Sequence, residues 1–127
     1  MNTWRQILSY EEPAPNISVD LSVWDSTDRW LDSTGDINEN KVDTVLYYRL
    51  ERNVIKEVRR VLGRVANFVT IVLDNEWDWN EDAVMFAVKF TGPKDLIKKL
   101  ILARTDAWFS GCKNNQEAEE LITNSMS

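Results

Sequence analysis

The chain has 127 residues, the size of one ordinary domain with its own hydrophobic core. Hydrophobic residues make up 43% and charged residues 28%, a balance that excludes a disordered chain. The formal net charge is -6, there is no histidine, and there is one cysteine. The composition therefore excludes a histidine-based active site, an internal disulfide and a zinc site.

Nothing in the sequence indicates a membrane or an oxidising compartment. No apolar run approaches the roughly 20 residues that cross a bilayer. The N-terminus begins Met1-Asn2-Thr3-Trp4-Arg5 and lacks the basic region and long apolar stretch of a secretion signal. Cys112 stands alone. We therefore expect a soluble, intracellular protein of a reducing compartment.

The first forty residues combine a helical, an extended and a turn-rich segment. Trp4–Tyr10 fits a short helix that ends before Pro13 and Pro15. A period of two predicts a half-buried strand, with its apolar face made by Ile17, Val19, Leu21 and Val23. Residues 25–40, rich in Asp, Ser, Thr, Gly and Asn, predict a loop with a helical turn around Trp30. Residues 1–35 are a candidate N-terminal arm.

The strongest helical pattern follows this loop. Asn38 or Asn40 is placed to cap its start, and Gly63 to end it. One apolar stripe runs along it at helical spacing, made by Val42, Leu46, Leu50, Val54, Val58 and Val61, with Val45, Ile55 and Leu62 beside it. The basic residues of this segment lie mostly off the stripe.

Two short apolar runs, 68–73 and 83–90, predict adjacent strands of an antiparallel hairpin. The polar connection 74–82 between them includes possible strand extensions around Trp77 and Trp79. Gly92 and Pro93 then open a second main helix, with the proline at its first position and Gly111 at its end. Its expected buried face is Leu96, Ile97, Leu100, Ile101, Ala107 and Trp108.

The chain is expected to form one α+β domain over residues 1–127. The element order is α–β–α–β–β–α, with a small antiparallel sheet whose central hairpin packs against two main helices. Residues 117–122 predict one or two further helical turns within a polar C-terminal tail, 113–127. The predicted core consists of Leu50, Val54, Val58, Leu100 and Ile101 with Ile71, Val72, Phe86 and Val88.

The residues that most enzymes use are missing from the sequence. No glycine-rich phosphate loop is present, and a serine nucleophile would have no imidazole base. The carboxylates lie in predicted exposed loops, where burial does not tune their pKa values. We therefore expect no catalytic residues and no cofactor, and we rank an enzyme that uses carboxylates below a binding protein.

Residues 32–43 carry oxygen ligands at the spacing of a calcium loop and run into a helix. The position that needs glycine holds Ile37, and the last ligand is Asp43 instead of glutamate. We therefore interpret the segment as a turn followed by a helix cap and expect no metal. Residues 74–82 match a calcium loop less well.

Charge is segregated along the chain. Residues 1–40 and 74–82 are acidic, whereas residues 49–64 are basic. We expect Arg52, Lys56, Arg59 and Arg60 to contact an acidic surface of a partner or of a sister subunit, with Asp74, Glu76 and Asp78 as candidate counterparts. The alternative is a solvated helix face. The acidic overall charge argues against specific nucleic-acid binding.

Two of the six tryptophans, Trp77 and Trp79, lie within the acidic connection. Period two places both on one side of any strand extension. Either they are exposed interface anchors, or they fold over the end of the sheet. Trp108 is expected in the core, and Trp4, Trp24 and Trp30 are placed to attach the N-terminal segment to the domain.

Three segments of the sequence resemble the adaptor proteins of the head–tail connector of tailed bacteriophages. They are Asp32–Glu39, the helix ending Val58-Arg59-Arg60-Val61-Leu62-Gly63-Arg64, and the later Pro93–Ala103 with Trp108-Phe109. The resemblance covers roughly residues 32–110. It departs where the alanines usual in the first helix are Val54 and larger residues. It implies a ring-forming, non-catalytic subunit of a connector or neck, found in the virion or the host cytoplasm.

The alternative function is a small acidic inhibitor of the immunity or anti-defence type. Such a protein would present residues 74–82 and their tryptophans to a basic surface on an enzyme. Both functions make the chain an interaction protein, and both require a protein partner.

Overall fold

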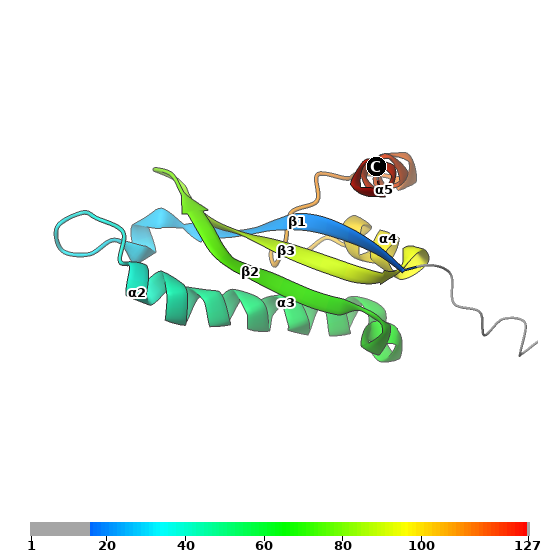
Figure 1. Cartoon of the computed structure of the whole chain (residues 1–127), viewed down its shortest axis with the longest axis horizontal. Coiled ribbons are helices and arrows are strands. Elements are labelled where there is room, and N and C mark those ends of the chain that lie inside the picture. Colours follow the sequence, from blue (N-terminus) through cyan, green and yellow to red (C-terminus); the bar gives the residue numbers. More distant parts are fainter. Residues whose placement is uncertain (1–15, 127) are drawn as a thin grey trace, which may run out of the picture.

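The computed structural model describes residues 16–126 and shows an α+β fold (Figure 1). The expected helix Trp4–Tyr10 lies outside the described residues. In chain order the elements are β1 (Asn16–Ser26), the 3-10 turn η1 (Thr27–Trp30), α2 (Glu39–Lys41), the π-helical segment η2 (Val42–Leu46), α3 (Tyr47–Leu62), the 3-10 segment η3 (Gly63–Phe68), β2 (Thr70–Trp79), β3 (Ala83–Pro93), α4 (Lys94–Leu102) and α5 (Asn115–Met126).

The three strands form one antiparallel sheet in the order β1-β3-β2. β1 pairs with β3 along its whole length, so this part of the proposed N-terminal arm belongs to the sheet. The predicted alternation is confirmed, because Ile17, Val19, Leu21 and Val23 are all buried. The hairpin of β2 and β3 is also confirmed, with its turn at residues 80–82.

A nearly continuous helical run from Glu39 to Leu62 lies alongside the sheet (Figure 1). Of the two candidate caps, Asn38 is used: its side-chain oxygen accepts a hydrogen bond from the Lys41 amide. Gly63 ends the helix with φ at 62°, a conformation that a side chain disfavours. The predicted stripe is buried at Val42, Leu46, Leu50, Val54, Val58 and Leu62, whereas Val61 is only half-buried.

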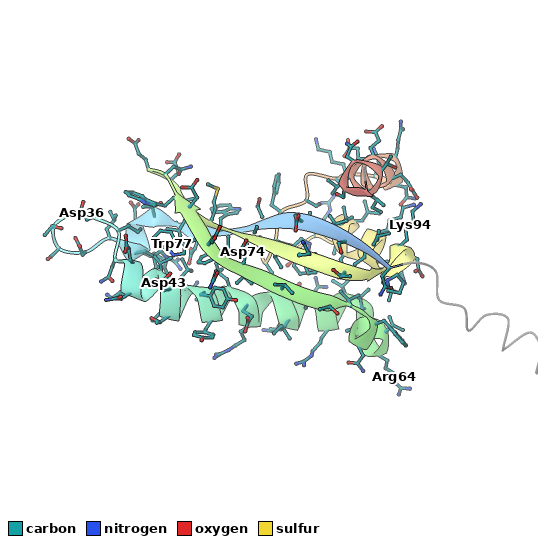
Figure 2. All side chains as sticks on the ribbon, in the orientation of Figure 1. Asp36, Asp43, Arg64, Asp74, Trp77 and Lys94 are labelled. Atoms are coloured by element: carbon teal, nitrogen blue, oxygen red, sulfur yellow. The ribbon has the colours of Figure 1, made fainter. Side chains whose placement is uncertain are left out.

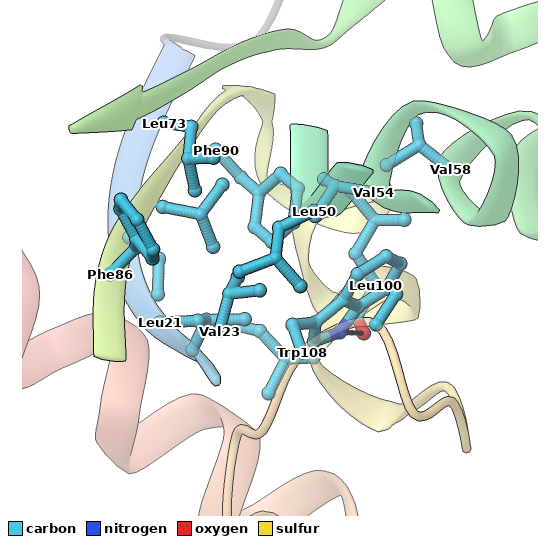
Figure 3. Packing of buried hydrophobic residues seen from close by; sticks show 14 of the residues in the cluster. Leu21, Val23, Leu50, Val54, Val58, Leu73, Phe86, Phe90, Leu100 and Trp108 are labelled. Carbon is cyan, nitrogen blue, oxygen red and sulfur yellow. Dashed lines mark hydrogen bonds between the residues drawn. The ribbon is translucent and has the colours of Figure 1, made fainter. Parts of the chain in front are cut away.

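The core lies between this helical run, α4 and one face of the sheet (Figure 3). Leu50, Val54, Val58, Leu100, Ile101, Phe86 and Val88 are buried as predicted. Ile71 is half-buried, and the placement of Val72 in the core is wrong, since its side chain is 55% exposed. Leu73 takes the inward position. A strand alternates its faces, so residues 71 and 73 cannot share the core with 72.

Two element boundaries differ from the sequence prediction. β2 begins at Thr70, because Phe68 belongs to η3. Its continuation to Trp79, across an irregularity between Leu73 and Trp77, is the strand extension expected around Trp77 and Trp79. Pro93 is the residue before α4 and not its first position. A proline is tolerated at this position, because the amides at the start of a helix have no hydrogen-bond partner within the helix.

The prediction that α4 continues to Gly111 is wrong, since α4 ends at Leu102. Ala107 and Trp108 are nevertheless buried, in the segment that follows. The Trp108 ring nitrogen donates a hydrogen bond of 3.0 Å to the Leu100 carbonyl, and its ring packs edge-on against Phe90 (Figure 3). Trp108 therefore belongs to the core, as expected, but reaches it from a loop.

The last helix, α5, is longer than the one or two turns expected for the polar tail. It packs beside β1 and α4, and its Ala118 and Ile122 are buried. On its surface Glu119 pairs with Lys94 and Lys98 of α4, each at 2.9 Å. The apolar spacing of four residues between Ala118 and Ile122 is the feature that fixes the buried side.

We predict that Leu100→Ala lowers the free energy of unfolding by ~2–5 kcal/mol, because it leaves a cavity in the centre of the core. Val72→Ala, on the exposed side of β2, is expected to change it by less than ~0.5 kcal/mol. Urea denaturation of both variants measures the difference. Equal effects at the two positions would contradict the core described here.

Candidate functional site

The helical run has a second side chain row, turned away from the sheet. Its members are Val45, Tyr48, Arg52, Ile55, Lys56 and Arg59, and we call them the outer face of α3. Tyr48, Glu51, Arg52, Ile55, Lys56 and Arg59 line a shallow groove along the surface. The outer face therefore combines apolar and basic groups in one continuous surface.

The three basic residues of the outer face are not held by ion pairs within residues 16–126, although the charge of Lys56 helps to lower the pKa of the adjacent Glu57. Within residues 16–126, the side chains of Arg52, Lys56 and Arg59 make no hydrogen bond and no ion pair. Glu51 lies in the same groove but does not pair with them. Their positive charge is thus available to an external group.

Arg60, grouped with these residues from the sequence, lies in another hollow, which Lys56 also borders. Its guanidinium pairs with Glu57 at 2.7 Å and donates a long hydrogen bond to the Arg104 carbonyl. The hydrogen bond from Arg60 holds the pKa of Glu57 below its usual value. Arg60 therefore faces residues 104–107, and Glu57 on the same helix already pairs with its charge.

The apolar residues of the outer face were not recognised as a surface: Val45 and Ile55 were placed beside the buried stripe, whereas Val45 is exposed and Ile55 is half-buried. Tyr48 is 61% exposed and Val45 is 55% exposed. The Tyr48 ring stands edge-on to Tyr47, with ring centroids 5.5 Å apart. Tyr47 is itself held by a hydrogen bond of 2.8 Å from its hydroxyl to the Leu73 carbonyl. The exposed ring of Tyr48 thus packs against a side chain that is itself held in place by a hydrogen bond.

A signal for this surface was present in the sequence. Val45, Tyr48, Arg52, Ile55 and Arg59 follow one another at intervals of three and four residues. This is the spacing that places side chains in a single row on a helix. The sequence pattern of the buried stripe is more evident, because each member of that stripe is aliphatic, whereas the outer row mixes apolar and basic residues.

The second surface is one end of the molecule, and residues that are distant in sequence build it. Residues 25–43 and 74–82 together hold eleven acidic residues against two basic ones, and we call them the acidic end. Figure 2 shows Asp36, Asp43 and Trp77 toward one end of the long axis and Arg64 and Lys94 at the other. The acidic and basic residues are therefore separated in the folded molecule as well as in the sequence.

Three hydrogen bonds join the two acidic segments. The buried Thr27 donates its amide to the Asp82 carbonyl at 3.1 Å and its hydroxyl to the Asn80 carbonyl at 2.8 Å. The Trp77 ring nitrogen donates to Asp43 at 2.6 Å (Figure 2). These contacts hold the carboxylates close together despite their mutual repulsion.

The structure separates the two tryptophans of this segment. Trp77 is half-buried, packs against the core and hydrogen-bonds to Asp43. Trp79 is 44% exposed at the end of β2. Trp77 thus folds over the end of the sheet, and Trp79 remains as the candidate anchor. Trp30 is buried, whereas Trp24 is exposed.

The three candidate counterparts of the basic residues lie on different parts of β2. Asp74 borders a hollow with Asp20 and Lys89, and its carboxylate accepts the Glu76 amide at 3.0 Å. Asp78 accepts the Trp79 amide at 2.8 Å. The side chain of Glu76, by contrast, makes no hydrogen bond or ion pair to any described residue. All three are exposed.

The loop that resembled a calcium site is a turn followed by a helix cap, as interpreted. The Asp32 carboxylate accepts hydrogen bonds from the Thr34 hydroxyl, the Thr34 amide and the Asp36 amide, at 2.6, 2.8 and 3.1 Å. These bonds, the one from the Thr34 hydroxyl first, lower the pKa of Asp32. Within the part of the chain that the structure describes, no group of three His, Cys, Asp or Glu side chains is arranged to hold a metal ion.

A second groove lies between α3 and residues 104–109, bordered by the exposed rings of Trp24 and Phe109. One charged pair in this groove is internal, since Arg49 lies 3.5 Å from Asp25. Cys112 is half-buried, and burial raises the pKa of its thiol, which disfavours the nucleophilic thiolate. None of these groups forms a nucleophile with an adjacent base.

The chain has no match among protein-family models, curated proteins or solved structures. Over residues 16–126, no helix is long and apolar enough to cross a membrane. The geometry of the two surfaces is therefore the basis for a functional assignment.

We predict that millimolar calcium, or a chelator, leaves the melting temperature unchanged. The reason is that the Asp32 carboxylate is already occupied by donors of its own loop. Differential scanning calorimetry measures the effect. A saturable stabilisation by calcium, abolished by Asp32→Ala together with Asp36→Ala, would overturn this expectation.

The bond between Trp77 and Asp43 is expected to contribute ~1 kcal/mol to stability, the usual net value of a hydrogen bond. A double-mutant cycle with Trp77→Phe and Asp43→Ala measures this coupling. Asp28→Ala replaces Asp43→Ala in the control cycle, which is expected to be additive within ~0.5 kcal/mol. Additivity in both cycles would show that the contact does not join the two acidic segments.

Proposed function

We propose that this chain is a non-catalytic structural subunit that assembles with other protein chains through the outer face of α3. The assembly that we favour is the head–tail connector or neck of a tailed bacteriophage. In this role the chain needs no cofactor and no nucleic-acid sequence, and its function is to hold subunits together.

The observation that supports this proposal most is the lack of ion pairs on the outer face within residues 16–126. Arg52, Lys56 and Arg59 have no ion pair within the described residues, although the chain as a whole has an excess of carboxylates. Beside them lie the exposed side chains of Val45 and Tyr48. Tyrosine and arginine are enriched among the residues that dominate protein interfaces.

The connector is favoured among assemblies by the resemblance of residues 32–110. The elements that carry this resemblance are the acidic turn at Asp32–Asp36, the helix that ends at Gly63-Arg64, and the helix that follows Pro93. One feature departs from it further, since Trp108 and Phe109 follow α4 instead of ending it. A ring of identical subunits requires two different contact surfaces on each copy, and this chain has two of opposite charge.

The titratable groups support a non-catalytic role. Among residues 16–126, the carboxyl groups with a lowered pKa are Asp32, Glu57 and Glu119, and each owes the shift to a local hydrogen bond or ion pair. They lie on separate elements and do not converge on one cleft. A general acid and base need opposed environments around a common reacting site.

The acidic end supports a second candidate function, that of an acidic inhibitor. It holds eleven acidic residues in sequence segments that the fold brings together, of which Asp25 is largely buried and pairs with Arg49, and Trp79 is exposed among them. Such a surface fits the basic substrate-binding face of an enzyme. In that case the acidic end would carry the binding and the outer face of α3 would contribute nothing.

Charge reversal on α3 tests the proposed function. We predict that the wild-type chain forms oligomers whose mass rises with protein concentration and falls with added salt, because screening weakens exposed charge contacts. Lys56→Glu with Arg59→Glu should abolish this association without changing the melting temperature. Size-exclusion chromatography with light scattering measures the mass.

The matched control is Lys99→Glu with Lys113→Glu, which makes the same change in net charge on exposed side chains of other elements. It should associate like the wild type. If reversal of Lys56 and Arg59 leaves the mass unchanged at every concentration, the outer face is a solvated surface and the proposed function is wrong.

A further inference from the structure

We propose that the outer face of α3 receives the acidic end of a second copy of the same chain, so that copies join head to tail. The contact places the end of the β2–β3 hairpin, with Trp79, Glu76 and Glu81, against Tyr48, Arg52, Lys56 and Arg59. This inference rests on the proposed function, because it names the partner of the surface assigned there.

Charge complementarity selects the occupant. Residues 52–64 hold five basic residues and one acidic residue, whereas the acidic end holds eleven acidic residues and two basic ones. The carboxylates of Glu76 and Glu81, like the bases of the outer face, make no hydrogen bond or ion pair inside the described region. Each surface thus lacks what the other provides.

The two surfaces of one copy do not meet each other. The buried stripe of α3 is turned toward the sheet, so Arg52 and Lys56, which lie off that stripe and are exposed, are turned away from it. The hairpin that carries Glu76 and Glu81 belongs to that sheet and ends near η1, where Thr27 holds its turn. Complementary charges that cannot pair within a chain favour pairing between chains.

A symmetric pairing of two outer faces is the competing arrangement, and charge opposes it. Two α3 helices packed face to face would bring Arg52, Lys56 and Arg59 of one copy against the same residues of the other. Like charges in contact destabilise an interface. The head-to-tail contact replaces this repulsion with attraction. It leaves one free surface of each kind at the two ends of an open oligomer and none in a closed ring.

The proposed contact also buries apolar side chains, in addition to bringing opposite charges together. Trp79 is 44% exposed on the acidic end, and Tyr48 is 61% exposed on the outer face beside Ile55. Burying these rings together removes apolar surface from water, while the carboxylates remain near the bases at the edge. The hydrogen bonds of Thr27 and Trp77 hold the acidic end in place beforehand, which reduces the entropy lost on binding.

A mixing experiment tests this arrangement. The first variant, Lys56→Ala with Arg59→Ala, damages the outer face and keeps the acidic end. The second, Glu76→Gln with Glu81→Gln, damages the acidic end and keeps the outer face. Each alone should associate about tenfold more weakly than the wild type, as expected when two exposed ion pairs are lost together. At a protein concentration too low for the weakened contacts to form, an equimolar mixture should form dimers of one chain of each variant and nothing larger, because only one intact contact remains.

The control is Asp20→Asn with Glu120→Gln, which removes the same negative charge from exposed positions outside the acidic end. It should associate like the wild type. Analytical ultracentrifugation of the wild type, the three variants and the mixture gives the masses, and circular dichroism checks that each variant is folded.

The possible failures are distinguishable. If the Glu76 and Glu81 variant associates as strongly as the wild type, or if the mixture yields no mixed dimer, head-to-tail docking on the acidic end is wrong. The proposed function survives that result if reversal of Lys56 and Arg59 still dissociates the oligomers. If that reversal changes nothing, both are overturned.

Discussion

The packing of one long helical run across one face of a three-stranded sheet is the constraint on which the rest of this structure depends. The run from Glu39 to Leu62 is about 36 Å long at 1.5 Å per residue, and strands of ten or eleven residues span a similar distance at about 3.3 Å per residue. Matched lengths let a single aliphatic stripe cover the inner face of the sheet. The side chains of the helical run that lie outside this stripe remain free for other contacts, and they include the row from Val45 to Arg59.

The same packing forces a local concentration of charge. The helical run and the hairpin both reach the end where residues 25–43 lie, so acidic segments about fifty residues apart in sequence become neighbours. The repulsion between these carboxylates opposes folding, and the bonds made by Thr27 and Trp77 offset part of it. A surface that is costly in the isolated chain becomes favourable once a basic group of another copy neutralises it. In this account, charge segregation and assembly have one physical origin.

Much of the fold follows from local patterns in the sequence. The alternation from Ile17 to Val23, the stripe from Val42 to Leu62, the hairpin and the glycine at position 63 are each specified by residues close together in the chain. The errors arise where nonlocal packing decides. Val72 is as apolar as Leu73, and only the alignment of β2 with β3 determines which one faces inward. Trp108 looks helical by spacing, yet its hydrogen bond to Leu100 and its contact with Phe90 hold it in a loop.

The candidate surfaces were predictable in part. The basic character of Arg52, Lys56 and Arg59 and the acidity of residues 74–82 are local properties. The separation of Arg60 from that group depends on Glu57, which lies only three residues away on the same helix and was a visible signal. The joining of the two acidic segments depends on contacts such as Trp77 with Asp43, which no local pattern indicates.

Chemical cross-linking is a direct test of whether the outer face of α3 binds the acidic end of another copy. Equal amounts of unlabelled and ¹⁵N-labelled chains are mixed and treated with a zero-length carbodiimide reagent, which joins a lysine to a carboxylate in direct contact. Mass spectrometry of the digest then shows whether each link joins labelled to unlabelled peptides. The account predicts mixed-label links from Lys56 to Glu76 or Glu81. Because Lys56 lies beside Glu51 and Glu57, links from it within one chain are expected in any case. The absence of mixed-label links from Lys56 to Glu76 and Glu81, or mixed links that involve only other surfaces, would contradict head-to-tail docking.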